Sequence, residues 1–149
     1  MRRRARWGTA IFLVLLLVGP GLIMAQEMGY LTRRLIKSYD LLQEGKLDQA
    51  EKIYQEILQK YPDQPLALNN LAALLVKKKD YEKALILLEK AWPKAEGYQV
   101  LVNQVCDVEG ICLAFRPLDA VYGNQDLQPL IKLNLDLVRA KLQAQKEAK

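Results

Sequence analysis

The chain repeats itself with a period of 34 residues from Leu31 onward. When residues 31–64 are aligned with residues 65–98, side chains of similar character coincide at several offsets. The aligned pairs are Leu41 with Leu75, Leu47 with Tyr81, Ala50 with Ala84, Tyr54 with Leu88, and Ile57 with Ala91. A period of this length is typical of repeat proteins, in which one unit cannot bury its apolar face alone. The repeat therefore predicts stacked units that share one continuous core.

Each unit reads as a helix, a short polar turn and a second helix. The expected helices are 31–43, 47–61, 66–77 and 81–92, with turns at 44–46 and 78–80. Between the units, Asp63 is expected to cap the next helix and Pro65 to occupy its first turn, while Pro93 ends the last helix. Small residues at the aligned alanines would let neighbouring helices approach closely, and large residues would fill the gaps between them.

These residues carry a resemblance to a known family. They are Leu41, Gly45, Leu47, Ala50, Tyr54 and Pro62 in the first unit, and Leu71, Ala72, Leu75, Asp80, Tyr81, Ala84, Leu88 and Ala91 in the second. In their spacing and size the chain resembles the tetratricopeptide repeat family over residues 31–98. The resemblance implies an all-α fold, a short right-handed α-solenoid of two helical hairpins, 31–64 and 65–98. It departs from the family at Arg34 and Leu68, where a large aromatic residue is favoured, and a helical hairpin array of another kind is the alternative.

The last third of the chain, 99–149, is expected to complete the stack, because about three repeats or a capping helix are needed to close the core. The first helix of a third repeat unit would fall at 99–106, but the repeat pattern fails from Asp107. A clearer helix follows Asp126, which is placed to cap it. Its apolar positions recur at helical spacing: Leu127, Leu130, Ile131, Leu135, Val138 and Leu142. We interpret this region as a degenerate third unit followed by a C-terminal capping helix.

Residues 1–25 have the layout of a secretory signal peptide. Four arginines precede an unbroken apolar run at 10–18, and a Gly-Pro-Gly break follows. Ala25 is the small residue expected directly before a signal-peptide cleavage site. Cleavage before Gln26 is favoured over a retained membrane anchor, which is the alternative. Either way the arginines would stay in the cytoplasm. The protein is therefore expected to be exported, and to be either periplasmic or anchored in the inner membrane facing the periplasm.

The net charge of +5 does not indicate a nucleic-acid-binding protein. The four arginines of residues 1–25 account for almost all of it, so the remainder of the chain is nearly neutral and could neutralise few phosphates. The chain has no histidine, the commonest general base and metal ligand. With no other catalytic constellation visible, we expect neither an enzyme nor a metal or cofactor site.

Cys106 and Cys112 are the only cysteines. On a continuous helix a separation of six residues would place them on different faces, but Gly110 allows the chain to turn. In an oxidising compartment an even count favours a disulfide, which is our prediction. Two separate buried thiols and a redox-active pair are the alternatives, and the spacing is not that of a C-x-x-C motif.

The family resemblance also implies a function. Tetratricopeptide arrays bind a partner peptide or domain in a concave groove lined by the first helix of each hairpin. On this sequence that groove would comprise Thr32, Leu35, Tyr39, Leu42, Asn69, Asn70, Ala73, Val76 and Lys77. The amides of Asn69 and Asn70 could hydrogen-bond an extended backbone, although a solvated helix face or a bond within the repeat would also explain them. The expected function is a protein-binding scaffold in an envelope assembly for secretion, pilus formation or envelope biogenesis. A thiol-redox accessory protein using Cys106 and Cys112 is the alternative.

Overall fold

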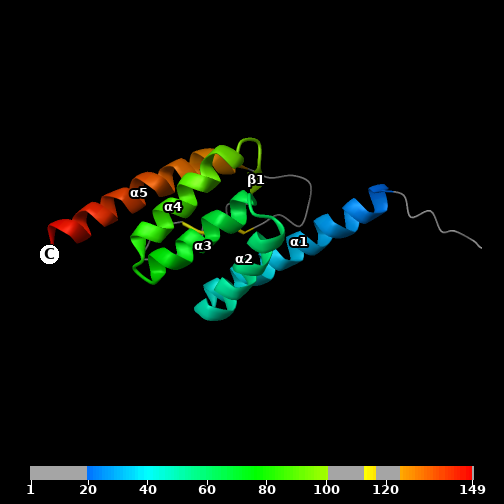
Figure 1. The fold of residues 1–149 in the computed structure, drawn as a ribbon, viewed down its shortest axis with the longest axis horizontal. Helices are drawn as coiled ribbons and strands as arrows, with labels where there is room; N and C mark the ends of the chain where they lie inside the picture. The colour runs from blue at the N-terminus through cyan, green and yellow to red at the C-terminus, as the bar shows by residue number, and fades with distance from the viewer. Residues whose placement is uncertain (1–19, 101–112, 117–124, 149) are drawn as a thin grey trace, which may run out of the picture.

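A computed structural model describes residues 20–100, 113–116 and 125–148, with side chains from residue 29 onward. Figure 1 shows the helices following one another across the molecule, with α1 and α2 on one side and α5 on the other. The described elements are α1 (Pro20–Gln43), α2 (Leu47–Lys60), α3 (Pro65–Lys77), α4 (Tyr81–Ala91), the 3-10 turn η1 (Trp92–Lys94), β1 (Gln99–Val100), β2 (Gln125–Asp126) and α5 (Leu127–Glu147). The predicted all-α class is confirmed.

The helices form two hairpins that share one core. Helix α1 packs on α2, α3 packs on α4, α2 joins the hairpins by packing on α3, and α5 lies against α4. Residues 34 positions apart have matching burial. Ala50 and Ala84 are both fully buried, and Tyr54 and Leu88 are at most 1% exposed. The sequence period thus arises because equivalent positions fill equivalent places in the core.

The two hairpin turns are also equivalent. Gly45 has a φ of 74° and Lys79, 34 residues later, has a φ of 63°. Both residues therefore lie in the left-handed region, where a side chain crowds the backbone and glycine is favoured. Each follows the end of a helix, the usual place for such a residue. The first turn has the favoured residue and the second does not.

This difference predicts opposite effects for a matched pair of substitutions. Lys79→Gly should raise the free energy of unfolding by about 1 kcal/mol, because it removes the left-handed strain. Gly45→Lys should lower it by about 1 kcal/mol, since nothing lies within 4 Å of an added Cβ and only the backbone conformation is penalised. Urea unfolding measures both. Changes of the same sign would show that these turns are not equivalent.

The start of α3 differs in one detail from the sequence prediction. Gln64, not Asp63, is the capping residue, and its Oε1 accepts a hydrogen bond of 2.8 Å from the Ala67 amide. Pro65 stands in the first turn, as predicted. Asp63 is exposed and lies 3.5–3.7 Å from the ammonium groups of Lys90 and Lys94. The residue adjacent to Pro65 is the one positioned to reach the free amides of the first turn, so the cap falls one residue later than expected.

Helix α1 is longer than predicted. Its end at Gln43 agrees with the expected 31–43, but it begins at Pro20. Proline is accommodated at the first helical position, and no residue between Gly21 and Leu31 forces the helix to stop. No helix within residues 20–100 and 125–148 is long and apolar enough to span a bilayer. Residues 1–19 of the predicted signal segment lie outside the described part of the chain.

The predicted third helix at 99–106 is wrong at its start. Gln99 and Val100 form β1, which pairs antiparallel with β2 so that Gln99 faces Asp126 and Val100 faces Gln125. The positive φ of Gly97, 70°, turns the chain into this short ribbon. The fully buried Val100 belongs to the core. The chain therefore leaves the 34-residue pattern immediately after α4 and η1.

Helix α5 begins at Leu127 and is capped, as predicted, by Asp126, whose Oδ1 accepts a hydrogen bond of 2.9 Å from the Gln128 amide. Pro129 lies in its first turn. Leu127, Ile131, Leu135 and Val138 are at most 3% exposed and belong to the same core as the two hairpins. This helix covers the apolar side of α4 that a further repeat would otherwise bury.

Candidate partner-binding site

The residues predicted to line a groove lie on α1 and α3, as expected, but most of them are buried. Thr32 is half-buried and Lys77 is exposed. The others have exposed fractions of 7% or less: Leu35, Tyr39, Leu42, Asn69, Asn70, Ala73 and Val76. These side chains are therefore not open to a guest in the closed chain.

Part of this surface is bonded to a short non-helical stretch, residues 113–116, which we call the docked segment. It is drawn in yellow in Figure 1. Asn70 holds one residue of it by two hydrogen bonds, because its Nδ2 donates to the Phe115 carbonyl at 2.7 Å and its Oδ1 accepts from the Phe115 amide at 2.9 Å. The Nδ2 of Asn69 donates to the Leu113 carbonyl at 2.7 Å. Both asparagines are fully buried. They are thus not a solvated helix face. A bond of 3.1 Å within the repeat, from Asn69 Nδ2 to Asn70 Oδ1, joins the two side chains, and both also bond the docked segment.

A third asparagine was missed by the sequence reasoning. Asn134 on α5 is 1% exposed, and its Nδ2 donates to the Leu113 carbonyl at 3.0 Å and to Asn69 Oδ1 at 2.8 Å. We call Asn69, Asn70 and Asn134 the asparagine cluster. One signal was present in the sequence: Asn134 lies on the apolar stripe of its helix, three residues after Ile131 and four before Val138. A polar residue there needs a buried partner.

The side chains of the docked segment alternate in burial. Leu113 and Phe115 are 2% and 4% exposed and join the core that contains Leu35, Leu42 and Val76. Ala114 between them is only half-buried. The guanidinium of Arg116 lies 3.6 Å from Asp40 of α1. The segment is thus held by its backbone, by two apolar side chains and by one ion pair.

Two tyrosines beneath this surface have raised pKa values. Burial raises the pKa of Tyr39, although the positive charge of Arg116 opposes the rise. Burial also raises the pKa of Tyr54 on α2, which is fully buried. Ser38 and Asn70 lie near the Tyr54 hydroxyl and partly oppose the rise in its pKa, but the hydroxyl makes no hydrogen bond of good geometry within the described residues. Removing that hydroxyl should therefore cost little at neutral pH.

The raised pKa of Tyr54 predicts a loss of stability in alkali. Below about pH 10 the phenol is neutral whether the chain is folded or unfolded, but above pH 10 only the unfolded chain releases the proton freely. The free energy of unfolding should therefore fall as pH rises above 10. Tyr54→Phe should reduce that fall by about 1.4 kcal/mol per pH unit. Tyr30→Phe, at a tyrosine that is 47% exposed, is the control. Identical pH profiles for the two variants would contradict this account.

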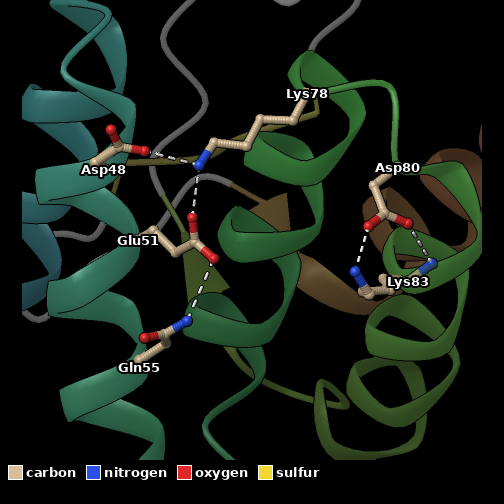
Figure 2. A network of polar contacts seen from close by, with 6 residues as sticks. All are labelled: Asp48, Glu51, Gln55, Lys78, Asp80 and Lys83. Carbon is tan, nitrogen blue, oxygen red and sulfur yellow. Dashed lines mark hydrogen bonds and ion pairs between the residues drawn. The ribbon is translucent and has the colours of Figure 1, made fainter.

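A second, separate depression lies where α2, α3 and α4 meet. It has a volume of about 350 Å³ and is lined by Glu51, Gln55, Leu71, Leu75, Lys83, Ile86 and Leu87. Figure 2 shows the polar contacts beside it: Lys78 bridges Asp48 at 2.9 Å and Glu51 at 2.7 Å, while Asp80 pairs with Lys83 at 2.7 Å. The bonds to Glu51 and Asp48 raise the pKa of Lys78. The Lys78 contacts tie the end of α3 to α2, whereas the Asp80–Lys83 pair lies within the first turn of α4.

Comparison with known protein families identifies the repeated part of the chain. Residues 41–102 match the model of the tetratricopeptide repeat family. The match covers α2, α3, α4 and the end of α1, and the helical structure is consistent with an all-α tetratricopeptide solenoid. Tetratricopeptide repeats generally mediate protein–protein interaction, and the match therefore indicates a protein partner. Comparison with the curated proteins and with the solved structures gives no match.

Two further predictions concern metals and thiols. Within residues 29–100, 113–116 and 125–148, no group of three or more His, Cys, Asp or Glu side chains is arranged to hold a metal ion. Cys106 and Cys112, predicted to form a disulfide, lie outside the described residues.

Proposed function

We propose that the protein is an exported, non-catalytic scaffold that binds a partner protein in an envelope assembly serving secretion, pilus formation or envelope biogenesis. The observation that carries the binding function is the asparagine cluster. Asn69 and Asn70 hold the backbone of a non-helical segment by hydrogen bonds of 2.7–2.9 Å on the helices that the tetratricopeptide repeat presents. A surface that binds a backbone in this way is suited to recognising a peptide segment.

The compartment is proposed from the sequence of residues 1–25. Arginines before an apolar run favour export, with the mature chain beginning at Gln26 and located in the periplasm, or with the segment retained as an inner-membrane anchor. In spheroplasts the protein should be degraded by added protease while a cytoplasmic marker survives. A chain lacking residues 1–25 should be protected. If the full chain were equally protected, the proposed localisation would be wrong.

The binding function can be tested by cross-linking in intact cells. A photo-reactive residue at Lys77, which is exposed at the end of α3 beside the buried predicted residues, should yield an adduct with one envelope protein. The matched control is Lys132, exposed on α5 and paired only with Asp136 of its own helix. Adducts from both positions in equal yield, or none from Lys77, would overturn the proposal.

A further inference from the structure

The docked segment occupies the place where a tetratricopeptide solenoid would be expected to receive a guest. Four hydrogen bonds from the asparagine cluster reach it, and all of them end on backbone atoms of Leu113 or Phe115. Because backbone atoms are common to all residues, any segment that presents an amide and carbonyls at the same spacing could make these bonds. Proline at the position of Phe115 could not, since it has no amide proton.

The side chains of the docked segment add selectivity to these bonds. The positions of Leu113 and Phe115 are enclosed by the core, the position of Ala114 is half-open, and the position of Arg116 faces the carboxylate of Asp40 at 3.6 Å. In order, the site thus accepts an apolar, a small, an aromatic and a basic residue. The acidic Asp40 would disfavour a carboxylate at the last position by like-charge repulsion.

We infer that this site recognises a segment of a partner protein with the pattern apolar–small–aromatic–basic, and that residues 113–116 are a resident occupant which the partner displaces. The inference rests on the proposed protein-binding function and names the chemistry of the segment that is bound. A second copy of this chain is a poorer occupant. Exchange of segments between two copies would form the same contacts as the closed chain and would also cost association entropy.

Competition of this kind has a measurable consequence. A ligand that binds only the open site has its apparent affinity reduced by the fraction of molecules in which the site is open. A substitution within the docked segment that weakens its contacts should therefore increase the affinity for an added peptide. This holds although the substituted residue lies outside α1, α3 and α5. Substitution of a residue that only stabilises the fold would lower the affinity for the peptide or leave it unchanged.

The test uses the full chain and a fluorescent peptide that carries Leu-Ala-Phe-Arg between Gly-Ser flanks, with binding measured by fluorescence anisotropy. Phe115→Ala should bind this peptide at least about tenfold more tightly than the unchanged protein. Arg116→Ala should show a smaller gain of about two- to threefold, because its ion pair is partly exposed. Leu133→Ala, on the exposed face of α5, should match the unchanged protein. A peptide with Ser in place of Phe should bind none of them.

Circular dichroism establishes which variants are folded. If Phe115→Ala is unfolded, the peptide affinity of Arg116→Ala tests the inference instead. Equal peptide affinity for the unchanged protein and the folded variants, or no binding to any of them, would overturn the inference. A dimer of the unchanged protein that the peptide dissociates would also overturn it and would assign the site to a second copy. These results are independent of the cross-linking at Lys77. A partner captured there without peptide competition would leave the proposed function standing and remove only this inference.

Discussion

Replacing Leu88 with alanine will lower the free energy of unfolding by about 3 kcal/mol. Leu88 is 1% exposed on α4, at the position that Tyr54 occupies in the first hairpin. Truncating its side chain removes buried apolar surface and leaves a cavity that the packed helices can close only in part. The loss should appear in urea unfolding as a lower midpoint with an unchanged slope.

Ile86→Ala is the matched control for this substitution. Ile86 lies two residues away on the same helix, but its side chain is 64% exposed at the edge of the open depression. The loss there should be below about 0.5 kcal/mol. Similar losses at Leu88 and Ile86 would mean that α4 does not bury the side that carries Leu88 in the shared core.

Asn70→Ala should be as costly as Leu88→Ala, at about 3 kcal/mol, for a different reason. The substitution leaves the buried amide and carbonyl of Phe115 without partners, and each unsatisfied group costs about 1–3 kcal/mol. Lys77→Ala, two turns further along α3 and exposed, should change the free energy of unfolding by less than about 0.5 kcal/mol. Equal effects of the two substitutions would contradict the role given to Asn70.

Much of the fold could be predicted from the sequence because the same pattern of residues occurs in both repeat units. The four predicted hairpin helices agree closely with α1 to α4 at their inner boundaries, since Gly45 and Asp80 mark turns in both units. The capping residue Asp126 was equally visible, because it directly precedes an apolar stripe of helical period. Local signals and the 34-residue period indicate the same structure here.

The contacts of the candidate site could be predicted only in part. Asn69 and Asn70 were recognisable as residues able to hold a backbone, but the docked segment lies more than 40 residues away along the chain. No periodic signal connects Leu113 and Phe115 to α3. Likewise Asn134 is a single polar residue in an apolar stripe, and its partners become evident only when α5 lies beside α3.

Amide hydrogen exchange at Phe115 tests the central claim most directly. If the asparagine cluster holds the docked segment, the Phe115 amide, bonded to Asn70 Oδ1 at 2.9 Å, should exchange slowly in the unchanged protein. In Asn70→Ala the Phe115 amide should lose nearly all of its protection, while the Leu88 amide within α4, although accelerated by the loss of global stability, should remain protected. A Phe115 amide that already exchanges at the rate of an unstructured peptide in the unchanged protein would contradict the account.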